Sequence, residues 1–279
     1  LENDRSELIA LYGRRRVGKT FLVREFFKNE IVFEVTGLYK GSMHDQLENF
    51  AKDLVRKVKQ PANWFDAFAL LEAYLNKRKS SKKKVVFIDE FPWIATARSK
   101  FLMAFENFWN SYCTQRDDLI VVICGSAASY MLQKIIRNKG GLHNRVTRYI
   151  RLLPFNLHET ALFLKSRRVN YTQYDILQIY MVMGGIPHYL EKLERGLSVA
   201  QNIDKLCFSK DGVLKNEFDQ LYTSLFDDSE KHLAIVRTLG KINKGMTRQQ
   251  LIDKSKISSG GDFSRKLEEL TESGFVNEY

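Results

Sequence analysis

The chain has 279 residues, 44% of them apolar, so it can bury one large core and a smaller second one. No apolar run approaches the roughly 18 residues that a membrane-spanning helix needs. The three scattered cysteines and five dispersed histidines predict neither a disulfide framework nor a Cys/His metal site. We therefore expect a cytoplasmic protein with reduced cysteines and no membrane partner. The net charge of +11 raises the question of a nucleic-acid partner.

Apolar strands alternate with helical patterns over the first half of the chain. Residues 7–12 (ELIALY) form a short apolar run that stops at Gly13, and a helix is expected from residue 19 to about 28. Further strands are predicted at 31–36, 85–88, 119–124 and 148–153, and further helices at 42–58, 64–76, 100–113 and 129–137. Continuous apolar strands between helices indicate a parallel sheet that is covered on both faces. This half therefore reads as a doubly wound α/β domain.

The strand signals disappear after Pro154, and helical patterns replace them. Helices are expected at 156–166, 172–183 and 187–195, and further helical segments continue to about residue 226. This part of the chain is predicted to be an all-α lid.

The last segment has its own pattern, in which three short helices precede an apolar end. A helix over 230–239 is followed by a second one that Thr247 caps, with Gln250 completing a capping box. Asp262 is expected to cap a third helix, and residues 275–279 to form a strand. This order is typical of a winged helix-turn-helix, and the unpaired strand suggests that it is truncated. The predicted domains are therefore 1–154, 155–227 and 228–279.

Residues 13–20 (GRRRVGKT) match G-x-x-x-x-G-K-[ST] at every fixed position. Gly13 and Gly18 let the backbone curl so that its N–H groups face a phosphate, and the following helix adds its positive dipole end. Lys19 is expected to reach the β- and γ-phosphates, and the Thr20 hydroxyl to hold Mg²⁺. Because the motif lies between a predicted strand and a predicted helix, we interpret it as a phosphate-binding loop.

The remaining residues of the loop, and the residue after it, are expected to line the bound nucleotide: Arg14, Arg15, Arg16, Val17 and Phe21. The three arginine side chains should point away from the phosphate. We expect them to be solvated, and contact with a partner is the alternative.

Two carboxylates follow the apolar strand 85–88. The carboxyl end of a strand is where an open α/β sheet binds its ligand. Asp89 is expected to hold the magnesium shell, directly or through water, and Glu90 to polarise the water that attacks the γ-phosphate. The second acid favours hydrolysis over phosphoryl transfer to a substrate.

Two further side chains are candidates for catalysis. Ser126 follows the strand 119–124 and could hydrogen-bond the attacking water or the γ-phosphate, or cap the next helix. Arg145, with Arg148 as a second candidate, could be an arginine finger presented across a subunit interface. An ordinary surface arginine is the alternative for both.

Positive charge is concentrated in two segments. A solvated loop explains residues 77–84 (KRKSSKKK), but residues 119–158 contain no acid and could serve a phosphate, a partner subunit or nucleic acid. The third helix of the C-terminal segment has more acids than bases, which is unfavourable beside phosphates. We therefore expect any DNA contact to come from the basic core rather than from the winged helix.

Five stretches of the chain together resemble the archaeal-type ATPase family of prokaryotic AAA+ superfamily ATPases, which is related to the STAND and origin-recognition-like P-loop ATPases. They are LYGRRRVGKT (11–20), VVFIDEFPWI (85–94), VVICGSAASYM (121–131), RLLPF (151–155) and GGIPHYL (184–190). The resemblance covers nearly the whole chain. It departs from the family in having no arginine at an obvious sensor-2 position in the lid. The family's flanking segments, before Leu1 and after Tyr279, are also missing from this sequence, so weaker nucleotide binding is expected.

The resemblance implies a RecA-like P-loop NTPase core with a five-stranded parallel sheet in the order 5-1-4-3-2, an all-α lid and a C-terminal winged helix-turn-helix. It implies ATP and Mg²⁺ as cofactors, with Pro187 lying against the adenine from the lid side. The Walker A, Walker B and sensor-1 roles would fall to Lys19 and Thr20, to Asp89 and Glu90, and to Ser126.

Two functions remain open at this point. The first is Mg-dependent ATP binding and hydrolysis coupled to a conformational switch, which Glu90 favours. The second is a nucleotide-gated DNA- or protein-binding regulator with little turnover, which the attached winged helix favours. Either could act as a homo-oligomer or with a protein partner.

Overall fold

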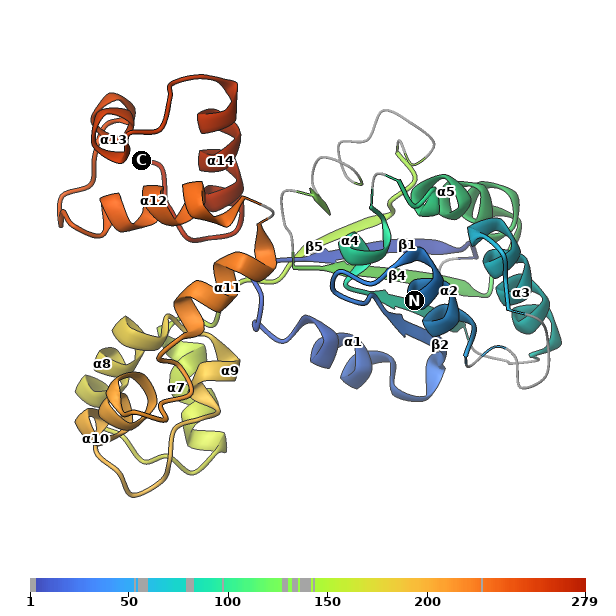
Figure 1. The fold of residues 1–279 in the computed structure, drawn as a ribbon. Helices are drawn as coiled ribbons and strands as arrows, with labels where there is room; N and C mark the ends of the chain where they lie inside the picture. The colour runs from blue at the N-terminus through green and yellow to red at the C-terminus, as the bar shows by residue number, and fades with distance from the viewer. Residues whose placement is uncertain are drawn as a thin grey trace. The chain divides into compact units, whose positions relative to one another are not determined.

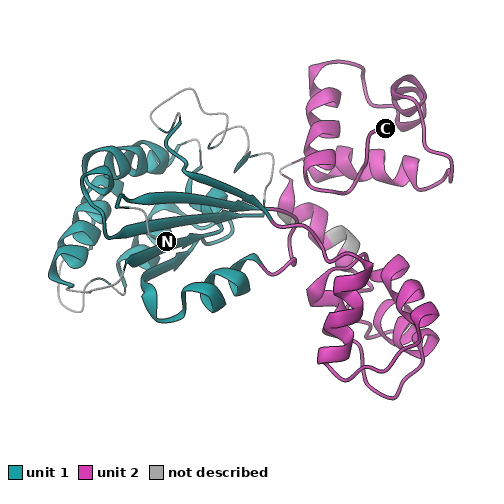
Figure 2. Cartoon of the chain, turned by 180° about the vertical axis from the view of Figure 1, so that it is seen from behind, with its two compact units in different colours: residues 1–12, 19–151 teal, residues 13–18, 152–279 magenta. Residues whose placement is uncertain are grey.

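The computed structural model describes residues 4–52, 54, 60–78, 83–96, 98–126, 130, 131, 135, 142, 144–226 and 228–279. The chain divides into two compact units (Figure 2). Unit 1 contains residues 1–12 and 19–151, and unit 2 contains residues 13–18 and 152–279. The loop 13–18 therefore belongs to unit 2, although it connects two elements of unit 1.

Unit 1 is built on a five-stranded sheet with the strand order β2-β3-β4-β1-β5 (Figure 1). All pairings are parallel. This is the predicted order 5-1-4-3-2, which is thereby confirmed. The strands are β1 (Glu7–Tyr12), β2 (Ile31–Thr36), β3 (Lys84–Asp89), β4 (Leu119–Gly125) and β5 (Arg148–Arg151).

The burial of each strand follows its place in the sheet. Every residue of β3 and β4 is buried, because helices cover both faces of these central strands. The edge strand β2 is only partly buried, and β5 at the other edge is exposed throughout. Strands β1, β3 and β4 therefore carry the core that fixes the site at their carboxyl ends.

The helices of unit 1 pack on this sheet through an aromatic core. They are α1 (Lys19–Phe27), α2 (Met43–Ala51), α3 (Trp64–Lys77), α4 (Phe91–Ile94) and α5 (Phe101–Ser111), with 3₁₀ turns at Lys28–Glu30 and Cys113–Gln115. Phe101, Phe105 and Phe108 of α5 are fully buried, and Trp64 meets Phe101 with ring centroids 4.7 Å apart. Most of the helix predicted at 129–137 lies outside the described residues.

Helices alone form the described part of unit 2 between residues 157 and 225. They are α7 (Leu157–Ser166), α8 (Gln173–Met183), α9 (Pro187–Leu190), α10 (Val199–Ile203), a π-helical segment (Asp204–Phe208) and α11 (Glu217–Leu225). The helix expected over 187–195 already ends at Leu190. Val17 of the loop 13–18 packs in the same hydrophobic core as Leu164 and Ile179, which explains why the loop belongs to this unit.

Three helices complete unit 2: α12 (Ser229–Leu239), α13 (Arg248–Ser255) and α14 (Gly261–Glu272). Thr247 and Gln250 form the predicted capping box. The prediction that Asp262 is an N-cap is wrong. Gly260 has that position, and Asp262 lies in the first turn, where its carboxylate pairs with Lys231 and Arg265.

The strand predicted at residues 275–279 is absent from the structure, because no strand in the described part of the chain pairs with it. Phe275 and Val276 instead pack against the core of α11 to α14. The Phe275 ring lies 4.7 Å from the Tyr222 ring, centroid to centroid. No helix in the described ranges is long and apolar enough to cross a membrane.

Candidate active site

The carboxyl end of β3 places Asp89 beside the start of α1. Asp89 is only 4% exposed, and its Oδ2 accepts a 2.6 Å hydrogen bond from the Thr20 hydroxyl. Its Oδ1 accepts from the Glu90 amide at 2.9 Å. Because both oxygens accept hydrogen bonds, the carboxylate has a fixed orientation next to the Thr20 hydroxyl.

Glu90 has a left-handed backbone conformation, with φ 45° and ψ 45°. Its carbonyl oxygen accepts a 2.9 Å hydrogen bond from the Trp93 amide in the first turn of α4. A Cβ on Gly37 would lie 2.7 Å from the same oxygen, so only glycine fits beside it. A non-glycine residue in this conformation is strained, and such strain is common at functional sites.

Ser126 directly follows β4 and is 2% exposed. Its hydroxyl oxygen lies 2.8 Å and 2.7 Å from the two carboxylate oxygens of Glu90, and its amide is 3.4 Å from Oε2. The side chain therefore holds Glu90 at the end of the neighbouring strand. Neither role predicted for Ser126 from the sequence included this contact.

Lys19 opens α1 and is 7% exposed. Its charge and those of Asp89 and Glu90 act on Cys124, but burial raises the pKa of that thiol most strongly. Burial also raises the pKa of Cys113. Both thiols are buried and free, as predicted, so neither is a nucleophile in this site.

The loop 13–18 has three residues with positive φ. Gly13 has φ 147°, and a Cβ there would lie only 2.2 Å from the backbone oxygen of Leu152. Gly18 has φ 94°, and a Cβ there would meet nothing within 4 Å. Arg16, with φ 70°, is the non-glycine residue among them. A left-handed residue beside a right-handed one points successive N–H groups at one anion, so the positive φ of Arg16 suits a phosphate loop.

Two arginine side chains of this loop contact other residues, whereas the sequence predicted that they would be solvated. Arg16 Nη1 lies 2.6 Å from Glu217 Oε2, and the Arg14 guanidinium carbon is 4.4 Å from the centroid of the Phe275 ring. Burial lowers the pKa of Arg14, although Tyr189, Tyr222 and Glu217 oppose the shift. The prediction of solvated arginines is therefore wrong for Arg14 and Arg16, because both side chains turn into unit 2.

Of the other predicted site residues, three are exposed and Pro187 is half-buried. Phe21 on α1 is 69% exposed, and Arg145 and Arg148 are also exposed. Pro187 is the first residue of α9. The turn before it packs tightly, because a Cβ on Gly185 would lie 2.0 Å from the Phe155 carbonyl oxygen. Within the described part of unit 1, no hydrogen bond or ion pair joins Arg145 or Arg148 to the Thr20–Asp89–Glu90–Ser126 group.

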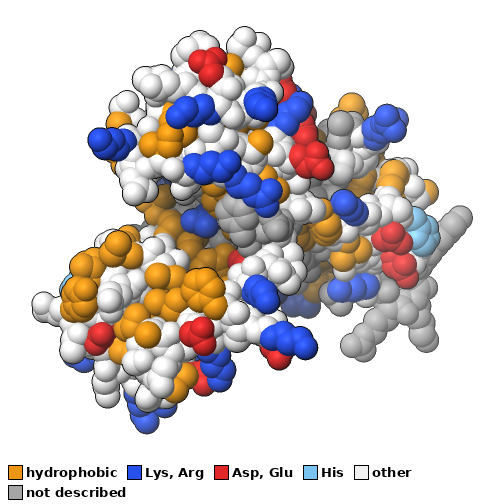
Figure 3. Space-filling model, turned by 60° about the vertical axis from the view of Figure 1, so that its left-hand side comes forward, with side chains coloured by type: hydrophobic (Ala, Val, Ile, Leu, Met, Phe, Trp, Pro, Cys, Tyr) orange, Lys and Arg blue, Asp and Glu red, His pale blue; other side chains and the backbone are white. Residues whose placement is uncertain are grey.

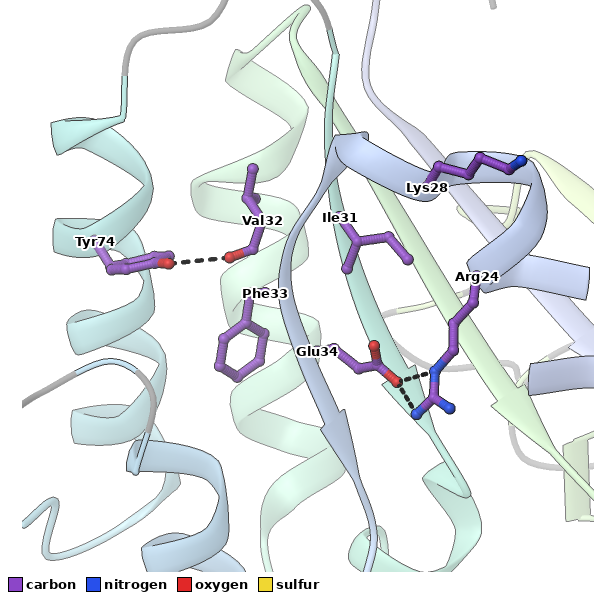
Figure 4. A pocket seen from close by; sticks show the side chains of 7 residues that line it. All are labelled: Arg24, Lys28, Ile31, Val32, Phe33, Glu34 and Tyr74. Atoms are coloured by element: carbon purple, nitrogen blue, oxygen red, sulfur yellow. Dashed lines mark hydrogen bonds and ion pairs between the residues drawn. The ribbon is translucent and has the colours of Figure 1, made fainter. Parts of the chain in front are cut away.

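An ion pair at the β2 edge, between Arg24 and Glu34, lines a cavity of about 360 Å³ (Figure 4). Arg24 binds Glu34 Oε1 through Nε at 2.9 Å and Nη2 at 2.6 Å, and the Tyr74 hydroxyl donates to the Val32 carbonyl at 3.1 Å. These groups satisfy one another. None of the predicted catalytic residues lines this cavity, so it is not the active site.

The fold and the motif residues define the chain as a P-loop ATPase. Residues 1–193 match a family described as an ATPase domain found predominantly in Archaea. The chain belongs to this family.

Known proteins with a similar sequence or fold include several from archaea. An uncharacterised protein of Methanocaldococcus jannaschii is 28% identical over 241 residues, which are 86% of this chain and 51% of that protein. The chain therefore spans about half the length of this relative. The Walker-type ATPase paby2304 of Pyrococcus abyssi has a TM-score of 0.66 at 16% identity, covering 98% of this chain and 86% of that one. The ORC2 protein of Aeropyrum pernix, in ADPNP and ADP complexes, has a TM-score of 0.57 at 17% identity, covering 98% and 81%. At these identities the two structures establish similarity of fold.

Proposed function

We propose that this ATPase binds Mg-ATP and hydrolyses it with Glu90 as the residue that activates water. The observation that carries the proposal is the pair of contacts at the carboxyl ends of β3 and β4. Thr20 is fixed to Asp89 at 2.6 Å, and Glu90 is fixed to Ser126 at 2.7 Å. The two carboxylates thus have different partners and can have different roles.

Thr20 and Asp89 fit a magnesium ion, because both present oxygen atoms, which this ion prefers. When bound, the ion neutralises charge on the phosphates. Lys19 supplies a positive charge for the β- and γ-phosphates, and the N–H groups of residues 13–18 bind phosphate oxygens. Residues 14–17 of the loop and Phe21 line the nucleotide, and Pro187 contacts its base.

Glu90 accepts a proton from the attacking water as the water oxygen bonds to the γ-phosphorus and the bond to the β–γ bridging oxygen breaks, which releases ADP. The Ser126 hydroxyl has one hydrogen to donate and faces both Glu90 oxygens. It therefore orients the carboxylate and leaves acceptor capacity on the second oxygen. Arg145 is the candidate for charge stabilisation from a neighbouring subunit, and its exposure suits that role.

The test is turnover of a Glu90→Gln variant, which keeps the shape of the side chain and removes its basicity. We expect the rate of phosphate release to fall by about 10² to 10⁴-fold while ATP binding persists. Glu25→Gln on the exposed face of α1 is the matched control, because Glu25 pairs only weakly with Lys28 at 3.4 Å. Unchanged turnover in Glu90→Gln would exclude Glu90 as the base.

Hydrolysis in this proposal drives a conformational switch between a core (1–154), a lid (155–227) and a C-terminal winged helix-turn-helix (228–279). Separate hydrophobic clusters around α8 and around α12 to α14 support the last two as distinct parts. The alternative, a nucleotide-gated regulator, is favoured by the exposed apolar side chains of α8, which suit a protein partner. Tyr174 and Met181 of this helix are 68% and 78% exposed. Steady-state phosphate release separates the two, since a regulator would bind ATP with little turnover.

DNA is proposed as a partner of the basic core. Arg145, Arg148 and Arg151 are all exposed, and no acidic residue interrupts residues 119–158. Helix α14 is less suitable, because Lys266 is buried and Arg265 is paired with Asp262 at 2.6 Å. A homo-oligomer would place Arg145 beside a neighbour's nucleotide.

A further inference from the structure

The two arginines at alternate positions of the loop 13–18 end on one cluster of side chains, which we call the Glu217 cluster. Its members come from α9, from α11 and from the segment after α14, and all belong to unit 2: Tyr189, Glu217, Tyr222 and Phe275. Of these four residues, Tyr189 lies in the stretch GGIPHYL (184–190), and none of the quoted motifs includes the other three. They lie 170 or more positions after the loop, yet they surround its arginine side chains.

Glu217 is the charged member of the cluster, and its side chain is 9% exposed. One carboxylate oxygen lies 2.6 Å from Arg16 Nη1, and the other accepts a 2.8 Å hydrogen bond from the Tyr189 hydroxyl. The Arg16 guanidinium carbon is also 5.8 Å from the centroid of the Tyr189 ring. A carboxylate this buried requires its partner, so the ion pair strongly restrains the position of Arg16.

Arg14 occupies the aromatic side of the cluster. Its guanidinium lies over the Phe275 ring at 4.4 Å, a distance at which a cation and an aromatic face attract each other. Phe275 is held in turn by Tyr222, which is 1% exposed. The ends of the loop are fixed as well, since Gly13 packs against Leu152 and Val17 lies in the core of the lid.

The backbone of Arg16 gives this contact a consequence for phosphate binding. Its φ of 70° is unfavourable for a residue with a Cβ. Such a residue populates the left-handed conformation about fivefold to thirtyfold less than the right-handed one. The same angle forms the nest whose N–H groups bind an anion. The ion pair with Glu217 keeps Arg16 in that conformation before any nucleotide arrives.

We propose that Glu217 is a positioning residue that preorganises the phosphate-binding loop through Arg16, and so links nucleotide affinity to α11. This inference rests on the proposed function, because the loop must bind a nucleotide phosphate. Glu217 does not take part in the chemistry. It acts on the loop, and a displacement of α11 would weaken nucleotide binding.

The experiment compares the affinity of the full chain for Mg-ATP and Mg-ADP by calorimetry. We expect Glu217→Gln to weaken both about fivefold to thirtyfold, and to raise KM while kcat changes little. Glu194→Gln is the matched control, because Glu194 forms a comparably short pair with Lys205, at 2.7 Å, on an exposed part of unit 2. Equal affinities of Glu217→Gln and the wild type would overturn the inference.

Variants of Arg16 provide a second, independent test of the inference. Arg16→Gly tolerates the left-handed angle without help, whereas Arg16→Ala does not. We therefore expect Arg16→Gly to bind ATP more tightly than Arg16→Ala, and Glu217→Gln to have no further effect in the Arg16→Gly background. Equal affinities of the two Arg16 variants would contradict the inference, and this arm stands even where Glu217→Gln fails to fold.

Amide hydrogen exchange of residues 14–18 without nucleotide separates this inference from the proposed function. Faster exchange in Glu217→Gln, with no ATP binding by the wild type, would mean that the proposed function is wrong and the restraint on the loop is real. Normal ATP binding by the wild type, with loop exchange and affinity unaltered in Glu217→Gln, would leave the ATPase intact and refute the role of Glu217.

Discussion

Ser126 and Glu90 form a contact between adjacent strands whose geometry depends on a single hydroxyl. The sequence predicted both residues for the site, because each directly follows a buried strand. It did not predict that they bind each other, since the two strand ends are distant in sequence and meet only through the pairing of β3 with β4.

A Ser126→Ala variant tests the orienting role of this hydroxyl. We expect kcat to fall about tenfold to a hundredfold, with little change in ATP affinity, because an unoriented Glu90 is a poorer base. Ser126→Thr keeps the hydroxyl and serves as the control in the same phosphate-release assay. The orienting role is wrong if the alanine and threonine variants turn over equally fast.

Asp118 is a second residue whose surroundings allow a quantitative prediction. Hydrogen bonds from Arg116 lower its pKa to about 2, and the buried Lys84 adds to this effect at 2.7 Å. The folded pKa lies below the ordinary 3.8, so the stabilisation is present above about pH 4 and is lost as the pH falls through about 2. A shift of this size corresponds to about 2 kcal/mol.

We therefore expect Asp118→Asn to lower the free energy of unfolding by about 2 kcal/mol at pH 7, as measured by urea denaturation. The difference from the wild type should shrink as the pH is lowered from 4 towards 2. Asp117 is adjacent and exposed, so Asp117→Asn is the control. A difference that is independent of pH would show that the Asp118 charge is not its cause.

At the scale of elements, one local prediction was right, while another local prediction and one that depends on a distant partner were wrong. The Thr247–Gln250 capping box was predicted because all of its atoms lie within one turn. The Asp262 cap was wrong because Gly260 and Gly261 let the helix begin earlier. The terminal strand was wrong because strand formation depends on a distant partner, which an apolar pattern at residues 275–279 does not reveal.

The two glycines of the phosphate loop, Gly13 and Gly18, differ in how closely other atoms surround them. A Cβ on Gly13 would lie 2.2 Å from the Leu152 oxygen, but a Cβ on Gly18 would enter open space. We expect Gly18→Ala to lower the free energy of unfolding by about 1 kcal/mol, from its positive φ alone. Gly13→Ala should cost clearly more, because backbone must move. Urea unfolding without nucleotide measures both, and equal losses would contradict the packing role of Gly13.

At the scale of the whole molecule, the sequence predicted the sheet order correctly through the resemblance of its motifs to a known family. It did not predict that the loop 13–18 belongs to the second compact unit. That assignment depends on Val17, Arg14 and Arg16, whose partners are dispersed over α7 to α11 and the segment after α14. No local pattern identifies partners at such separations.

Charge distribution over the whole chain leads to a prediction about DNA. Figure 3 shows Lys and Arg side chains over the C-terminal helices as well, and Arg237, Lys241 and Lys244 are exposed there. We expect the triple variant Arg145→Gln, Arg148→Gln, Arg151→Gln to weaken DNA binding and to reduce the slope of log affinity against log salt by up to about 3. The control replaces Arg237, Lys241 and Lys244 by Gln. A larger loss in the control would identify the C-terminal helices as the DNA-binding surface.

The position of Glu217 has a practical consequence for anyone who expresses this ATPase in pieces. The family match ends at residue 193, so an excised domain with that boundary retains every residue of the Walker motifs and omits Glu217, Tyr222 and Phe275. Such a fragment would contain the complete Walker motifs, but its phosphate-binding loop would lack the contacts that Glu217 and Phe275 make with Arg16 and Arg14. Weak ATP binding by the excised domain would then result from the loss of these contacts, and it would not measure the affinity of the longer chain.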